Sequence, residues 1–136
     1  MSRAIIGAFY GTYNELGFGF LEPIYGRGLE ILLRDMGLDV RREYPIQIHF
    51  RGQVIGHHRC DMLVEGKVIV EIKGTEILPE SSKRQLRNYL AALRLGLGML
   101  LHFGPRANYH SVLGPRTVGA HQTDQDASGE SGSSST

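Results

Sequence analysis

Residues 68–74, with the sequence VIVEIKG, limit most strongly how this chain can fold. A strand that contributes to a hydrophobic core normally carries charged side chains only at its edges. This apolar stretch contains Glu71 and Lys73. Because side chains alternate along a strand, these two charges point the same way, opposite to Val70 and Ile72. Two charges that share one face of an apolar strand therefore need an explanation besides core packing.

The segment before it predicts an antiparallel partner strand. HHRCDMLV (57–64) is followed by EGK (65–67), which is typical of a tight hairpin turn. In such a hairpin Asp61 and Glu71 come close together, and two carboxylates repel unless a positive group lies between them. A divalent cation beside Lys73 would satisfy both, because magnesium prefers one or two carboxylates plus water and phosphate oxygens. Such a metal acidifies its bound water, which then attacks near neutral pH.

Hydrophobic periodicity predicts the other elements. Helices are expected from about residues 3–13, 21–36 and 80–95. Strands are expected at 44–50, 57–64, 68–74, 97–104 and 108–114, with residues 51–56 turning back from the first to the second. The order predicts an α/β domain with a mixed sheet.

Composition sets the wider frame. The chain has 136 residues, which suits one domain, predicted here at residues 1–116. Residues 117–136 carry three acids, no Lys or Arg, and much Gly and Ser, so they are expected to form a disordered acidic tail. A net charge of +1 does not by itself indicate a nucleic-acid partner. A single cysteine, and a first segment too polar for a signal peptide or membrane span, predict a cytoplasmic protein without membrane contact.

A second motif lies at residues 19–25, GFLEPIY, which has the pattern G-x-x-E-x-x-Y at Gly19, Glu22 and Tyr25. With the acid–acid–lysine set, it resembles the PD-(D/E)XK nuclease superfamily and, within it, the small bacterial GxxExxY proteins. KVIVEIKG and QLRNYL stand where that family has its second and third motifs. The resemblance covers about residues 5–113. It implies a restriction-endonuclease-like core, a mixed β-sheet flanked by α-helices.

The resemblance also implies roles for individual residues. Asp61 and Glu71 would bind Mg²⁺, or alternatively Mn²⁺, with help from the backbone carbonyl of Ile72. Lys73 would orient the attacking water and stabilise charge on the phosphate. Glu22 matches the helical acid that several branches use beside the metal.

The predicted helix at 80–95 carries a further set of candidates. Gln85 and Tyr89 lie one turn apart on one face and resemble the third motif of exonuclease-type branches, where the pair supports the site and the DNA. Lys83, Arg84 and Arg87 on the same helix would contact phosphates.

Ordinary structural explanations stay open for several of these residues. Glu71 and Lys73 could be a solvent-facing pair on an edge strand. Glu22 could only favour a helix N-terminus, and Tyr89 could be a core residue of an amphipathic helix. A solvated helix face would equally explain Lys83, Arg84 and Arg87.

Two other groups are assigned no chemistry. His57 and His58 are adjacent on a strand and so face opposite sides, which argues against a shared zinc. Cys60 is interpreted as a small buried hydrophobe rather than a nucleophile.

Two functional hypotheses follow. The first is a magnesium-dependent nuclease that hydrolyses DNA phosphodiesters, with a homodimer suited to cutting both strands of a duplex. The alternative is an accessory module of the same fold that binds nucleic acid or protein and cleaves only with a partner, or not at all.

Overall fold

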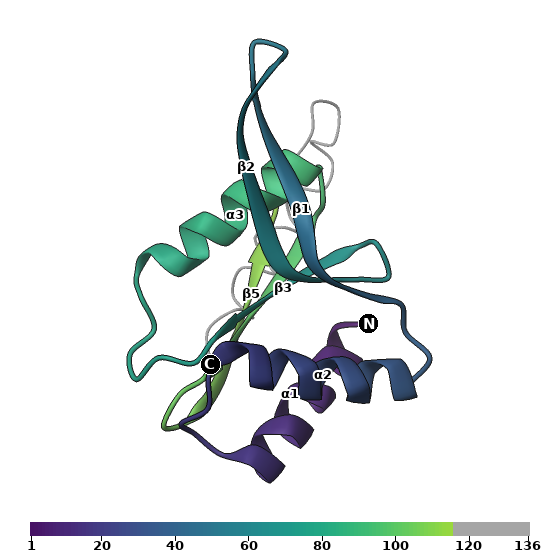
Figure 1. The fold of residues 1–136 in the computed structure, drawn as a ribbon, viewed down its shortest axis with the longest axis vertical. Coiled ribbons are helices and arrows are strands. Elements are labelled where there is room, and N and C mark those ends of the chain that lie inside the picture. The colour runs from purple at the N-terminus through teal and green to yellow at the C-terminus, as the bar shows by residue number, and fades with distance from the viewer. Residues whose placement is uncertain (116–136) are drawn as a thin grey trace, which may run out of the picture.

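The computed structural model describes residues 1–115, which form a five-stranded sheet and three helices (Figure 1). The elements in chain order are α1 (Ser2–Leu16), α2 (Glu22–Asp35), β1 (Val40–Phe50), β2 (Gln53–Val64), β3 (Val68–Lys73), α3 (Ser81–Leu93), β4 (Leu97–Phe103) and β5 (Ala107–Leu113). The predicted tail, residues 117–136, lies outside the described residues. No helix in the described part of the chain has the length and apolar character needed to cross a bilayer.

The sheet has the order β1-β2-β3-β4-β5. Only β3 and β4 are parallel; every other neighbouring pair is antiparallel. A parallel pair needs a long crossover, and α3 supplies it between β3 and β4. The prediction of an α/β fold with a mixed sheet flanked by helices is confirmed.

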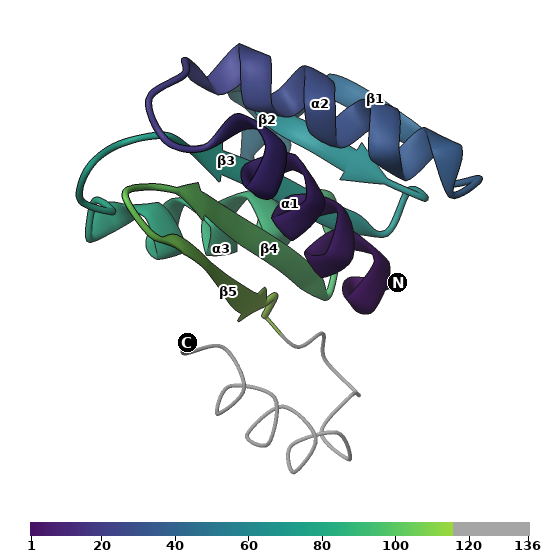
Figure 2. The ribbon, with the colours of Figure 1, turned by 90° about the horizontal axis from the view of Figure 1, so that it is seen from below.

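Helices α1 and α2 cover one face of the sheet, and α3 covers the other (Figure 2). Strand β3 lies between the two layers, so its alternating side chains enter two cores. Val70 and Ile72 pack in the core with α1 and α2, while Ile69 packs with α3. Glu71 and Lys73 therefore lie on the α3 side, buried and half-buried respectively, and not on an edge strand facing water.

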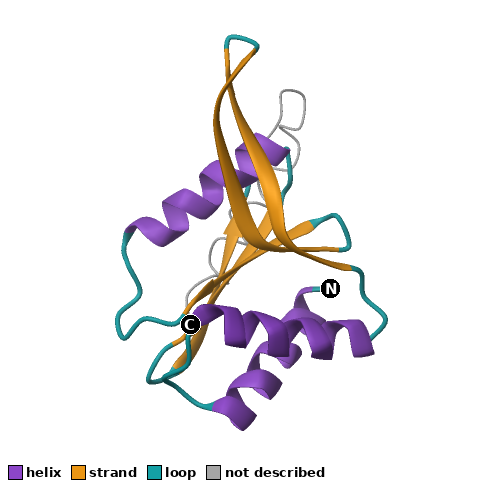
Figure 3. Ribbon diagram, in the orientation of Figure 1, coloured by secondary structure: helices purple, strands orange, loops and turns teal. Residues whose placement is uncertain are grey.

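The β1–β2 hairpin changes faces at Glu43 and Asp61. Val40 and Met62 pack in the α1/α2 core, whereas Ile46 and Cys60 pack in the α3 core. On regular strands Val40 and Ile46 would share one face, as would Met62 and Cys60, because they are separated by an even number of residues. Glu43 has a positive φ of 51°, and the regular register passes from Arg42↔Met62 to Tyr44↔Cys60. Beyond this point the hairpin continues as a long twisted ribbon, residues 44–60, which we call the arm (Figure 3). The base of the arm packs against α3 through Ile46 and Cys60, and its tip projects from the body.

Element boundaries differ modestly from those expected. Helix α3 ends at Leu93, two residues early, because Arg94 adopts a left-handed conformation. Strand β1 begins at Val40 rather than residue 44, because its first residues continue the pairing with β2. The turn predicted at residues 51–56 is confined to residues 51–52, because β2 begins at Gln53. The predicted turn at 65–67 is present, and Glu65 and Gly66 have the positive φ values, 55° and 66°, that tight hairpins require.

Candidate functional site

Asp61 and Glu71 meet where β2 separates from β3. The regular pairing of the two strands runs from Val64↔Val68 to Met62↔Val70 and goes no further. At the next position the backbone N–H of Asp61 donates to Glu71 Oε2 at 2.7 Å. The N–H of Ile72 donates to Asp61 Oδ2, also at 2.7 Å. The two carboxylates thus replace the backbone ladder and hold the diverging strands together.

Burial and mutual repulsion perturb both acids. Only 6% of Glu71 is exposed, and burial, followed by the negative charge of Asp61, raises the pKa of Glu71 to about 8. Burial also raises the pKa of Asp61, and the charge of Glu22 adds to the rise. The Ile72 N–H and the Lys73 ammonium oppose the rise in the pKa of Asp61 without cancelling it. An acidic pair in this state favours an added positive charge.

Lys73 and the segment after it are held in place from two directions. Glu22 Oε2 accepts a hydrogen bond from the N–H of Gly74 at 2.9 Å. His102, which pairs with Lys73 in the parallel register, lies with Nε2 2.6 Å from the carbonyl oxygen of Thr75. The end of β3 is therefore fixed on both sides of Gly74, which limits how far the Lys73 backbone can move.

The G-x-x-E-x-x-Y pattern has a clear local structure. Glu22 is the first residue of α2, and Tyr25 lies one turn further along the helix. The Tyr25 hydroxyl donates to the carbonyl of Gly17 and accepts from the N–H of Phe20 at 3.2 Å. Gly19, with φ of 120°, lets the loop turn between those two contacts. The motif thus fixes the α1–α2 loop and aims Glu22 at the end of β3.

The predicted residues of α3 divide into three groups. Tyr89 is 6% exposed and lies close enough to the acidic pair that Glu71 and Asp61, after burial, help to raise its pKa. Gln85 is exposed and lines a groove beside α3 together with Arg84. Lys83 and Arg87 lie outside the lining of that groove.

Two residues near the site were not singled out from the sequence. Arg42 packs over Gly26, bonds to Glu30 at 3.3 Å, and opposes the rise in the pKa of Asp61. His102 holds Thr75, as described above. Neither lies in a recognisable motif, because the position of each depends on strand register that only the folded sheet establishes.

The donor set suits a hard divalent cation. Asp61 and Glu71 offer carboxylate oxygens from two strands, as magnesium prefers. Within residues 1–115, however, no three His, Cys, Asp or Glu side chains gather closely enough to enclose a metal. Glu22, expected as a ligand, accepts the Gly74 N–H through Oε2, and its coordination of a metal stays a prediction. The structure therefore offers two carboxylates, with backbone carbonyl and water left to complete the coordination.

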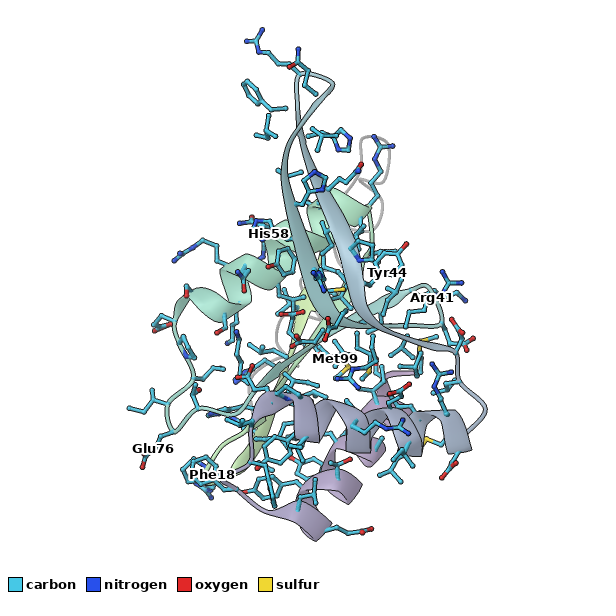
Figure 4. The ribbon with its side chains drawn as sticks, in the orientation of Figure 1. Phe18, Arg41, Tyr44, His58, Glu76 and Met99 are labelled. Atoms are coloured by element: carbon cyan, nitrogen blue, oxygen red, sulfur yellow. The ribbon has the colours of Figure 1, made fainter. Side chains whose placement is uncertain are left out.

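The residues that were assigned no chemistry behave as expected in the described structure. Cys60 is fully buried, and burial, then the charges of Glu71 and Asp61, raises the pKa of its thiol to about 12. A thiol in that state is not a nucleophile at neutral pH. His58 lies on the side of β2 that faces α3, its ring 5.7 Å from that of Tyr89 (Figure 4).

Comparison with known proteins decides the family. The sequence pattern of the PD-(D/E)XK nuclease superfamily matches residues 1–112. The chain belongs to this superfamily. Its members are generally nucleases that use divalent metal ions, so binding of nucleic acid is the general expectation for the fold. No protein of curated function matches the chain.

One solved structure supports the fold. The chain is similar to the protein in "Crystal structure of SSO0001", with a TM-score of 0.56 and 24% sequence identity. The match covers 71% of this chain and 52% of the other, so this chain spans about half the length of that protein.

Proposed function

We propose that this protein is a metal-dependent nuclease that hydrolyses phosphodiester bonds of DNA. The observation that carries the proposal is the pairing of Asp61 and Glu71 across the gap between β2 and β3, next to Lys73. A buried and a half-buried acid with raised pKa values cost stability when no positive charge lies between them, and such pairs are typical of functional sites. Membership of the superfamily, whose members generally use divalent metal ions, supports a divalent cation as that ligand.

Asp61, Glu71 and the carbonyl of Ile72 would hold Mg²⁺, or Mn²⁺ in its place. The cation would acidify a water molecule and neutralise charge on the phosphate. We assign Glu22 to support this centre through its bond to Gly74 and through its negative charge near Asp61, rather than by direct coordination.

Lys73 provides the positive charge that the protein itself brings to the reaction. Its Nζ–H groups would orient the attacking water and donate to the phosphate oxygen on which negative charge grows. The bonds that fix Gly74 and Thr75 would keep the Lys73 backbone in register with the acidic pair. Positioning of this kind lowers the barrier because little reorganisation is needed during reaction.

We also propose that the chain is of the GxxExxY type, since Gly19, Glu22 and Tyr25 each have a distinct structural role. Gln85 and Tyr89 would support the site and the DNA, and Lys83, Arg84 and Arg87 would contact phosphates. A homodimer would allow both strands of a duplex to be cut. A single cysteine, buried as a free thiol, fits a cytoplasmic location.

The test is cleavage of labelled supercoiled, linear and single-stranded DNA with Mg²⁺ or Mn²⁺ and with EDTA. Wild type is expected to cleave only with metal. Asp61→Asn keeps an acceptor for the Ile72 N–H but removes the charge, so cleavage is expected to fall by about 10²-fold or more. The matched control is Asp39→Asn on the exposed loop before β1, which should cleave normally. Equal cleavage by wild type and Asp61→Asn would refute the proposed site.

The accessory-module hypothesis is the second candidate, and the small acid set favours it: residues 1–115 bring no third carboxylate close enough to enclose a metal with Asp61 and Glu71. It predicts metal-independent binding without cleavage of any of these substrates. Cleavage that appears only with wild-type site residues and metal would exclude it.

A further inference from the structure

The arm, residues 44–60, is unusual in charge. It contains Arg51 and Arg59 and three histidines, and no Asp or Glu. Its tip, where Arg51 forms part of the turn, projects away from the body (Figure 1). Its base packs against α3 through Ile46 and Cys60, and Arg59 there is paired with Glu43 at 3.0 Å. A projecting basic ribbon is suited to a polyanionic partner.

A groove of about 1060 Å³ lies between the arm and α3. The arm side of its lining includes Gln47, His49 and His58, and the α3 side includes Gln85 and Asn88. Side-chain amides both donate and accept hydrogen bonds, so they suit the mixed edges of nucleic-acid bases.

Positive charge in this groove is present but sparse. Arg84 and Arg94 line it from α3 and its C-terminal cap, and none of its described lining residues is acidic. Two arginines can neutralise a short stretch of one backbone, whereas a duplex presents twice the charge per unit length.

The groove approaches the proposed catalytic centre through Tyr89. Tyr89 and His58 both line it, with ring centroids 5.7 Å apart. Tyr89 is buried beside the acidic pair, in the same core as Ile69 of β3. Asp61 and Glu71 do not line the groove, so a chain lying along it would be separated from the acidic pair by Tyr89.

The tip of the arm has exposed apolar side chains that support no core. Phe50 is 60% exposed and Ile55 is 64% exposed, and both lie outside the lining of the groove, so a strand would reach them beyond its end. The Arg51 guanidinium lies 5.7 Å from the centre of the Phe50 ring, leaving the ring otherwise open. Aromatic rings of this kind, next to arginine, stack on unpaired bases without regard to sequence.

We infer that the groove between the arm and α3 binds a single unpaired nucleic-acid strand, with its base edges toward Gln47, Gln85 and Asn88 and one base stacked on Phe50. This inference rests on the proposed function for the chemistry at its inner end, and it adds the substrate class and the surface that selects it. An unpaired strand is favoured because its base edges are free, as the amides require, and because stacking needs a splayed base.

The experiment measures binding by fluorescence anisotropy in EDTA, so that no cleavage occurs. The probes are a labelled DNA strand of about 12 nucleotides, an RNA strand of the same sequence and the corresponding DNA duplex. Wild type is expected to bind one or both single strands at least about tenfold more tightly than the duplex. Comparison of the DNA and RNA probes shows whether the groove accepts deoxyribose, ribose or both.

Two variants separate stacking from charge. Phe50→Ser is expected to weaken single-strand binding by about tenfold with an unchanged salt dependence, because it removes one stacked base. Arg84→Gln combined with Arg94→Gln should weaken binding and lower the salt slope by about 1.4, or ~0.7 for each lost phosphate contact. The matched controls are Ile31→Ser on α2 and Arg3→Gln on α1, both exposed, which should bind as wild type does. A thermal melt of each variant shows that it is folded.

The outcomes distinguish this inference from the proposed nuclease. If wild type prefers the duplex, binds nothing, or binds as its arm and groove variants do, the inference is wrong even if DNA is cleaved. If light scattering shows that Phe50→Ser changes only self-association, the tip is a dimer contact and the inference is again wrong. If strand binding depends on Phe50 and Arg84 but no metal supports cleavage, the inference stands and the proposed function fails.

Discussion

Replacing Glu71 by Gln should stabilise the metal-free protein at alkaline pH. The amide keeps an oxygen that can accept the Asp61 N–H, now bonded to Glu71 Oε2, and removes the buried charge. In the folded wild type, burial and the Asp61 charge raise the pKa of Glu71 from 4.5 to about 8. The folded state therefore holds a proton that the unfolded state releases between those two pH values.

The sign and size follow from this difference. The contribution of Glu71 to stability is complete below pH 4.5 and is lost as pH rises to about 8. A rise in the pKa of Glu71 from 4.5 to about 8 corresponds to roughly 5 kcal/mol in the free energy of unfolding, at about 1.4 kcal/mol for each tenfold change in proton affinity. Asp61 titrates together with Glu71 and shares this penalty, so we expect a measured gain of about 1–3 kcal/mol for Glu71→Gln above pH 8.

The assay is urea denaturation in EDTA at several pH values from about 5 to 9. The stability difference between Glu71→Gln and wild type should grow with pH and level off above about 8. Adding Mg²⁺ should then stabilise wild type and leave the variant unchanged, because only wild type keeps both acids. The control, Glu15→Gln on the exposed end of α1, should show no such trend. A constant difference between Glu71→Gln and wild type at every pH would refute the reasoning.

Three further predictions concern groups around the acidic pair and the chain end. Lys73→Met should keep or raise metal affinity in calorimetry but lower DNA cleavage by about 10²–10⁴-fold, because it removes only the ammonium; wild-type cleavage would contradict its assigned role. Gly104→Ala would place a methyl group 2.7 Å from the His102 ring, so we expect the free energy of unfolding to fall by about 1–3 kcal/mol and cleavage to slow. The control is Gly7→Ala, whose methyl group would meet no atom within 4 Å. Ending the chain after residue 116 should leave the melting temperature nearly unchanged, and an aggregated product would show that the domain boundary is wrong.

The sequence predicts the parts of this fold that depend on local pattern. The alternation in residues 68–74 correctly assigned Glu71 and Lys73 to one face, because a strand side chain has only two directions to take. The short turn at Glu65–Lys67 sets the register that brings Asp61 opposite Glu71. Both inferences use contacts close in sequence.

The remaining features depend on contacts between distant segments. Glu22 bonds to Gly74, 52 residues away, and no periodicity of either segment encodes that contact. The positive φ of Glu43, which turns the hairpin toward α3, occurs at a residue type with no preference for it. The roles proposed for Asp61, Glu71, Lys73 and Glu22 stay predictions until variants are measured.

One backbone feature accounts for both the acidic pair and the arm. If β2 continued to pair with β3 beyond Met62, the N–H groups of Asp61 and Ile72 could bond to backbone carbonyls of the neighbouring strand. The two carboxylates would then have no N–H group to accept from. Because β2 separates there, those N–H groups need acceptors, and Glu71 and Asp61 supply them. The same separation frees residues 44–60 to rise beside α3 and form the groove. If the two strands paired here, the carboxylates would lose these hydrogen bonds and the groove would not form. The proposed site therefore requires β2 and β3 to separate at this position.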